Sequence, residues 1–172
     1  MSDRKFLVGI DPGWKNLGSA VLEVKDGCFH LVDSRTWNPS KAPEPFPTEF
    51  AKYVNSKAPR EQVASVYMER YVPYNNTFTA EAENITMLIG ALREVLKPVH
   101  LVRAIDWKIS LVKMLAKHYG FDNPSGSLDK KFSIAAATFI LNGNGEFESD
   151  HEADAICLAA YHEFARRHLD GQ

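Results

Sequence analysis

Three apolar runs in the first 37 residues constrain the fold more than any other feature of this sequence. Residues 5–10 (KFLVGI) stop at Asp-Pro-Gly, which is typical of a buried strand followed by a tight turn. Residues 17–25 and 28–37 flank Asp26-Gly27, and an Asp-Gly pair between two apolar runs is the strongest short-range signal of a hairpin. The chain is therefore expected to begin with three strands, the last two joined as a hairpin.

Strand and helix patterns alternate along the rest of the chain, after a proline-rich loop. We expect strands over 63–69 and 99–103, and helices over 48–57, 77–96, 106–119, 129–141 and 150–168. Three sequential strands followed by alternating strands and helices predict an α/β fold, with a central mixed five-stranded sheet flanked by helices.

The length of 172 residues predicts one domain spanning 1–172. Cys28 and Cys157 are too few and too far apart for a disulfide framework, and their apolar surroundings predict two reduced, buried thiols. No apolar run reaches the length of a membrane span or of a signal-peptide core. We therefore expect a cytoplasmic protein with no membrane partner.

Two acidic residues stand at the ends of expected strands. Asp11 closes the first strand, and Glu69 closes the strand over 63–69. Because the carboxyl ends of parallel strands meet at one crevice where ligands bind, the two carboxylates are candidates for one site. A solvated carboxylate at a strand end is an equal alternative for either residue alone.

A third acidic group opens the helix expected over 149–164 (SDHEADAICLAAYHEF), which begins with a capping-box pattern. His151 lies three residues and Asp150 four residues before Asp154, so each shares a helix face with Asp154. The helix then becomes apolar, so its packing on the sheet would bring Asp154 near the strand ends. Converging acids repel unless a cation holds them, and carboxylate oxygens suit Mg²⁺.

The segments GIDPGWKNLG, YMER and DHEADA, taken together and in this order, resemble the RuvC-type Holliday junction resolvases of the ribonuclease H-like superfamily. The similarity runs from about residue 5 to residue 165. It implies a ribonuclease H-like fold and a crossover junction endodeoxyribonuclease. Such an enzyme resolves four-way DNA junctions by structure-selective, paired nicking, which leaves 5′-phosphate and 3′-hydroxyl ends.

The resemblance also implies a set of metal ligands. It assigns Asp11, Glu69, Asp154 and His151 as catalytic metal ligands, with Asp150 as the competing fourth ligand. The implied cofactor is Mg²⁺, with two ions per active site arranged for in-line phosphodiester hydrolysis. Mn²⁺ is expected to support activity as well, because imidazole is a less usual ligand for Mg²⁺ than carboxylate.

Basic residues gather between positions 93 and 131, where eight Lys or Arg residues face four acids, in a chain whose net charge is −2. Neutralisation of phosphates by Lys and Arg underlies non-specific DNA affinity. The resemblance places Lys108 and Lys131 near the scissile phosphate, Lys131 as a catalytic candidate. Lys131 is preferred because Ile134 and Ala137 then fall at the expected apolar offsets; Lys130, one residue earlier, is the alternative and a further DNA contact.

Arg70, Tyr71 and Tyr74 follow Glu69 and are candidate DNA contacts. In the family an aromatic residue just after this Glu inserts among the bases of the junction. Here the closest aligned residue is Val72, so the role would pass to Tyr71 or Tyr74. Stacking on an unpaired base contributes roughly 1–3 kcal/mol, whereas a place in the core is the alternative for either ring.

The helix over 77–96 offers Ile85, Leu88, Ile89 and Leu92, more apolar surface than one sheet face needs. In the family this helix contributes to a homodimer, and a junction with two cut strands calls for two symmetric sites. Ordinary core packing is the alternative.

Metal ligands do not encode substrate shape, so a ribonuclease H-like nuclease acting on other branched DNA or on RNA is the alternative function.

Overall fold

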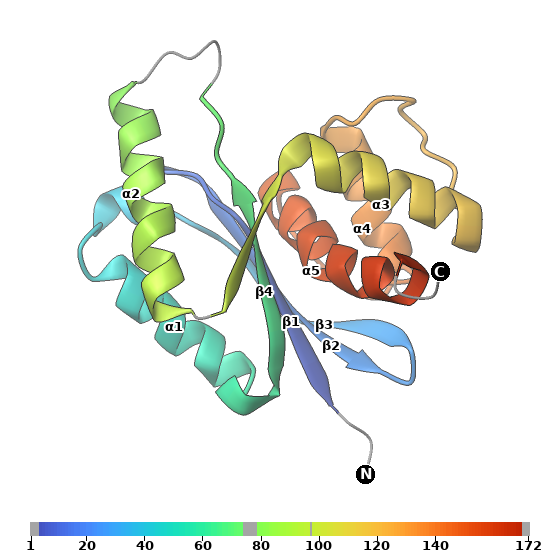
Figure 1. Cartoon of the computed structure of the whole chain (residues 1–172), viewed down its shortest axis with the longest axis horizontal. Helices are drawn as coiled ribbons and strands as arrows, with labels where there is room; N and C mark the ends of the chain where they lie inside the picture. The colour runs from blue at the N-terminus through green and yellow to red at the C-terminus, as the bar shows by residue number, and fades with distance from the viewer. Residues whose placement is uncertain (1–3, 74–78, 97, 170–172) are drawn as a thin grey trace.

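The computed structural model describes residues 4–73, 79–96 and 98–169. These residues build a five-stranded sheet in the order β3-β2-β1-β4-β5, with helices on both faces (Figure 1). β1 pairs antiparallel with β2 and parallel with β4, and β5 pairs parallel with β4. The predicted mixed sheet is confirmed. Its strands are β1 (Lys5–Asp11), β2 (Leu17–Lys25), β3 (Cys28–Trp37), β4 (Val63–Arg70) and β5 (Val99–Arg103).

The β2–β3 hairpin turns at Asp26 and Gly27, as expected. Their φ angles of 51° and 78° are both positive, the backbone that a two-residue type I′ turn requires. Cys28 pairs with Lys25 directly beside this turn and is exposed, whereas Cys157 is buried. The prediction of two buried thiols is therefore wrong for Cys28, because it is the first residue of β3 and lies beside the exposed turn at Asp26 and Gly27.

Helices cover the two faces of the sheet unequally (Figure 1). Two lie on one face, α1 (Phe46–Lys57) and α2 (Ala80–Val95). Three lie on the other, α3 (Ala104–Tyr119), α4 (Lys130–Ile140) and α5 (Asp150–Leu169). Short 3₁₀ turns, η1 (Pro39–Lys41) and η2 (Arg60–Gln62), flank α1. No helix among the described residues is long and apolar enough to cross a membrane.

The period-two alternation of β1 divides the core into two clusters. Val8 and Ile10 pack with α1 and α2, whereas Leu7 packs with α3, α4 and α5. We call the cluster of Val8 and Ile10 with α1 and α2 the α1–α2 cluster. The apolar residues of α2 are buried in it, so the expectation that they offer more apolar surface than one sheet face needs is wrong. Those residues are Ile85, Leu88, Ile89 and Leu92.

Two glycines let α5 lie directly on the sheet. A Cβ on Gly9 of β1 would lie 1.9 Å from the carbonyl oxygen of Ala155, and a Cβ on Gly18 of β2 would lie 2.0 Å from that of His151. Any side chain at either position would therefore push the helix backbone away. This close approach places the first turns of α5 beside the end of β1.

Candidate active site

Asp11 and Glu69 lie on neighbouring strands and point to the same side of the sheet. Ile10 of β1 pairs with Met68 of β4, and both side chains are buried in the α1–α2 cluster. Because side chains alternate along a strand, the next residues, Asp11 and Glu69, face α5 on the opposite side. The prediction that the two strand ends meet is confirmed.

His151 in the first turn of α5 contacts Asp11. Its Nδ1 lies 2.7 Å from Asp11 Oδ2, and this hydrogen bond raises the pKa of His151. The imidazolium form is therefore favoured next to the carboxylate. The His151 carbonyl lies directly against Gly18 of β2. This close approach fixes the distance between α5 and the sheet where His151 meets Asp11.

Asp154 stands about one helical turn further along α5. Its carboxylate accepts hydrogen bonds from Ser133 Oγ of α4 and, at 3.3 Å, from Lys108 Nζ of α3. Burial raises the pKa of Asp154, Lys108 opposes that rise, and the charge of Asp11 adds to it. The negative charge of Asp11 therefore acts on the carboxylate of Asp154.

Glu69 completes the group of carboxylates. Its Oε2 accepts a hydrogen bond of 3.1 Å from the indole Nε1 of Trp107, a fully buried residue of α3. Burial first, and the charge of Asp11 second, raise the pKa of Glu69 to about 7, with a further contribution from Asp154. Three carboxylates thus repel one another across one space at the carboxyl end of the sheet.

These donors fit a hard divalent cation in their chemistry. Carboxylate oxygens are preferred by Mg²⁺, and a cation would relieve the repulsion that raises the pKa of Glu69. Within the described part of the chain, however, no three His, Cys, Asp or Glu side chains are arranged closely enough to coordinate one ion. Asp11 contacts His151 instead, and Asp154 contacts Lys108 and Ser133.

Asp150, the competing fourth ligand, faces a different partner. Its Oδ2 lies 2.6 Å from Lys130 Nζ of α4, and this hydrogen bond lowers the pKa of Asp150. The structure therefore brings His151 to Asp11 and Asp150 to Lys130. Of the two candidates, His151 is the one in direct contact with the carboxylate group.

The register of α4 agrees only in part with the one that favoured Lys131. Ile134 is 44% exposed, whereas Phe132 and Ser133 are fully buried. The expected apolar offset is wrong at Ile134, because Ser133 turns inward to bind Asp154, and it is confirmed at Ala137, which is fully buried. Lys130 and Lys131 are both exposed, and Lys130 pairs with Asp150 in the first turn of α5.

The residues that follow Glu69 differ in how far they are exposed. Arg70 is exposed, whereas Tyr71 is partly buried and packs against the α1–α2 cluster, the core alternative for this ring. Val72 is exposed. Tyr74 lies outside the described residues.

Two residues of the site were missed in the sequence. Trp107 and Ser133 each donate a hydrogen bond to one of the carboxylates, from α3 and α4 respectively. The signal that could have identified Ser133 is that it is the single hydroxyl residue within the apolar run FSIAAA. Trp107 offered a weaker signal, its position directly before Lys108.

The sheet order, the helix placement and the acids at the ends of β1 and β4 define a ribonuclease H-like α/β fold. Among solved structures, the chain is similar to Thermus thermophilus RuvC, with a TM-score of 0.67 and 21% sequence identity over 94% of this chain and 95% of that chain. A second structure, T. thermophilus RuvC in complex with a Holliday junction substrate, aligns with a TM-score of 0.67 and 20% identity over the same shares. The likeness establishes the RuvC type of fold. No protein-family model and no curated protein sequence matches the chain.

Proposed function

We propose that this chain is a metal-dependent endonuclease that resolves four-way DNA junctions by paired nicking, leaving 5′-phosphate and 3′-hydroxyl ends. One observation carries the proposal: Asp11, Glu69 and Asp154 face one space on a fold of the RuvC type, and the charge of Asp11 contributes to the raised pKa of both Glu69 and Asp154. A RuvC structure with a Holliday junction supports the same substrate class here. A DNA substrate also supports a cytoplasmic location.

Asp11, Glu69, Asp154 and His151 are the proposed ligands of two Mg²⁺ ions, with Mn²⁺ as a second metal that supports activity. Asp150 is retained as the alternative to His151. When bound in such a site, the cations neutralise charge on the phosphate and activate the attacking water. Trp107 and Ser133 would hold two of the carboxylates in place through their hydrogen bonds.

Basic side chains next to the carboxylates would bind the phosphates. Lys108 lies 3.2 Å from Asp154 Oδ1, so a phosphate entering the site would meet an ammonium group already oriented there. Lys130 reaches the site from α4 through Asp150. Lys131 remains the neighbouring candidate, and Arg70 and Tyr71 continue the proposed DNA surface at the end of β4.

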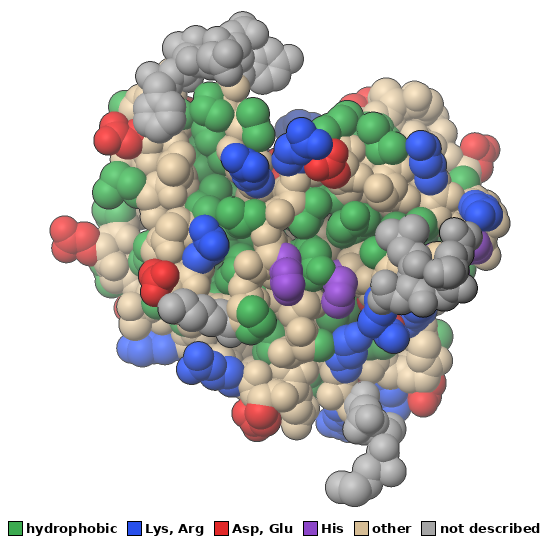
Figure 2. Space-filling view, viewed as in Figure 1, with side chains coloured by type: hydrophobic (Ala, Val, Ile, Leu, Met, Phe, Trp, Pro, Cys, Tyr) green, Lys and Arg blue, Asp and Glu red, His purple; other side chains and the backbone are tan. Residues whose placement is uncertain are grey.

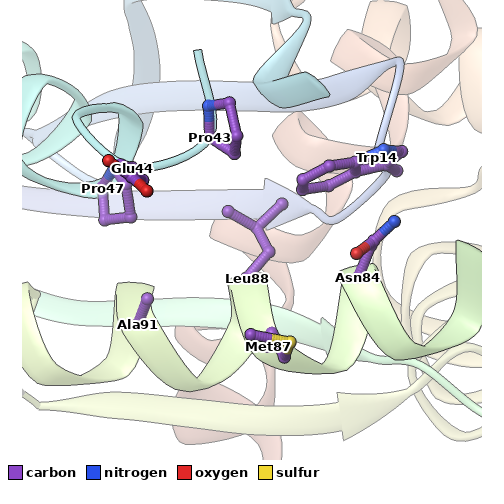
Figure 3. A pocket seen from close by; sticks show the side chains of 8 residues that line it. All are labelled: Trp14, Pro43, Glu44, Pro47, Asn84, Met87, Leu88 and Ala91. Carbon is purple, nitrogen blue, oxygen red and sulfur yellow. The ribbon is translucent and has the colours of Figure 1, made fainter. Parts of the chain in front are cut away.

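We further propose that the chain acts as a homodimer, because a four-way junction cut on two strands requires two symmetric sites. A groove of about 440 Å³ separates α2 from the loop before α1, and it is the proposed dimer face (Figure 3). Met87 of α2 is 68% exposed at its edge, and Trp14 and Pro47 line the other side. Sedimentation of the chain and of Met87→Glu tests this, since the variant should shift the mass to the monomer.

The substrate class is tested with matched four-way, three-way and linear duplex DNA in Mg²⁺ and in Mn²⁺. We expect paired symmetric nicks in the four-way junction alone, and DNA ligase should reseal them because the ends are 5′-phosphate and 3′-hydroxyl. Equal cutting of three-way DNA, or cutting of RNA, would establish the alternative ribonuclease H-like specificity instead.

A further inference from the structure

Two histidines share one tyrosine ring on the α5 side of the sheet. His100 of β5 pairs in register with Tyr67 of β4, and His162 comes from α5. Each imidazole stacks on the Tyr67 ring, with 4.9 Å between ring centroids for His100 and 4.8 Å for His162, and with planes 22° apart in both cases. Figure 2 shows histidine side chains gathered on the molecular surface between β5 and α5. These residues lie outside the set assigned to the candidate active site.

The two imidazoles lie side by side on one face of the tyrosine ring. Rings on opposite faces would have centroids about 7 Å apart or more, because stacking needs a contact distance of about 3.5 Å on each face. The centroids of His100 and His162 are only 6.3 Å apart, and their planes differ by 13°. The two imidazoles are therefore nearly coplanar neighbours.

This separation matches that of two imidazoles that hold one metal ion between them. A metal–nitrogen bond is about 2.0–2.1 Å and the nitrogen lies about 1.1 Å from the centre of its ring, so trans imidazoles have centroids roughly 6.4 Å apart. A tetrahedral ion requires the rings to be closer, at about 5.2 Å. The observed 6.3 Å favours an ion with trans ligand positions, which Cu²⁺ and Ni²⁺ offer in tetragonal geometry.

Ser65 of β4 orients one of the two rings. Its Oγ lies 3.3 Å from Nδ1 of His162, and Ser65 is buried. When Nδ1–H donates this hydrogen bond, the lone pair of Nε2 is free for a metal, and such a partner on the second nitrogen is usual for a ligating imidazole. Burial first, and the charges of Lys5 and His100 next, lower the pKa of His162, which favours the neutral form that binds metal.

A second histidine pair shows the arrangement that does not suit an ion. His118 of α3 and His168 of α5 stack face to face, with 3.9 Å between centroids and 7° between planes. An ion in the plane of one ring would lie outside the plane of the other. The side-by-side arrangement at Tyr67 is therefore what distinguishes His100 and His162.

We propose that His100 and His162 form a binding site for one divalent transition-metal ion of the Cu²⁺ or Ni²⁺ type. In the described part of the chain, no third His, Cys, Asp or Glu joins them, so water completes the coordination. Imidazole nitrogen suits these ions, whereas the carboxylates of the candidate active site suit Mg²⁺ and Mn²⁺. A bound ion would tie the edge strand β5 to α5 and stabilise the fold.

The site is tested by adding Cu²⁺ to the full chain in excess Mg²⁺, which competes for the carboxylates. We expect one Cu²⁺ per chain, with an electron paramagnetic resonance spectrum split by two nitrogens. The unfolding midpoint should rise by about 5–10 °C when free Cu²⁺ is 100 times its Kd. His100→Gln and His162→Gln should each weaken binding at least about tenfold and leave splitting by one nitrogen.

Ser65→Ala is an independent variant, because it keeps both imidazoles and removes only the partner of Nδ1. It should weaken Cu²⁺ binding about tenfold. His118→Gln is the matched control, an exposed histidine of the stacked pair, and should leave the affinity and the spectrum unchanged.

The inference is overturned if the chain binds no Cu²⁺ in excess Mg²⁺, or if His100→Gln retains the full affinity and the splitting by two nitrogens. Loss of the signal in His118→Gln with retention in His100→Gln would also overturn it. Nicking in Mg²⁺ should be unchanged in His100→Gln. Because the test measures metal binding, its outcome does not depend on whether the chain cuts DNA.

Discussion

Trp107 donates its indole N–H to Glu69 across 3.1 Å, from a side chain that is itself fully buried. The bond fixes the carboxylate at the end of β4, where burial and the charge of Asp11 raise its pKa to about 7. Above that pH the folded chain carries a buried charge that the unfolded chain would solvate. Glu69 therefore lowers the stability of the metal-free fold.

Replacing Glu69 with Gln should stabilise the metal-free chain at pH 8. The folded pKa of about 7 lies above the ordinary value of 4.5, so the penalty is largest above pH 7 and disappears as the pH falls toward 4.5. The gain is at most about 3 kcal/mol at about 1.36 kcal/mol per pKa unit. Thermal unfolding in EDTA at several pH values measures it; equal stability of the two chains at pH 8 contradicts the prediction. Nicking should be lost in the same variant.

Asp11→Asn should abolish nicking and leave junction affinity within about tenfold, because affinity depends mainly on phosphate contacts. A gel-shift titration and a nicking assay on the same junction separate the two effects. Asp26→Asn is the control, since Asp26 lies in the hairpin turn with a φ of 51° that Asn also adopts. Full cleavage by Asp11→Asn would refute the assignment of the site.

Replacing His151 with Ala should change the ratio of Mg²⁺- to Mn²⁺-supported activity far more than replacing Asp150 with Ala. His151 contacts Asp11 at 2.7 Å, whereas Asp150 is paired with Lys130. Nicking rates across a titration of each metal provide the measurement. Equal effects of the two substitutions would mean that the fourth ligand is misassigned.

Lys130→Ala should reduce turnover more than Lys131→Ala, because Lys130 is the one that reaches the first turn of α5. Single-turnover nicking rates at saturating protein give the comparison without a contribution from binding. The reverse ranking would restore the register that favours Lys131.

Glu163→Gln should destabilise the fold at pH 7 by about 2–4 kcal/mol, since it removes a buried charge from three cations. Glu163 lies 2.6 Å from Lys5, 2.7 Å from Arg166 and 3.1 Å from Arg167. Burial would raise its pKa, but hydrogen bonds from these cations lower it from 4.5 to about 2. The lowered pKa means that the stabilisation is present above pH 4.5 and is lost as the pH falls toward 2.

Chemical denaturation between pH 7 and pH 2 tests this behaviour. The gap in unfolding free energy between wild type and Glu163→Gln should narrow as the solution is acidified below pH 4.5. Glu61→Gln, on an exposed residue of η2, is the matched control and should leave the curve unchanged. A gap that is constant with pH would show that the carboxylate charge is not what stabilises this corner.

The elements of the fold follow from local sequence to within a few residues, because strand alternation and turn residues act over short distances. The Asp26-Gly27 turn and all five strands were predicted in this way. The convergence of Asp11 and Glu69 also followed, because it needs only the parallel pairing of two strand ends.

The remaining parts of the site depend on contacts between distant segments. Trp107 and Ser133 acquire their roles from Glu69 and Asp154, which lie 38 and 21 residues away. The register of α4 was mispredicted at Ile134 because apolar residues surround most of that helix, so its sequence does not reveal which side is buried.

Gly9 and Gly18 set how closely the backbone of α5 approaches the sheet at the site. Because α5 meets the strands at both points without an intervening side chain, the backbone itself limits how closely Asp11 and the acids of α5 approach each other. A core substitution that leaves both glycines in place is therefore expected to preserve that limit, whereas a methyl group at either glycine would move the acids of α5 away from Asp11.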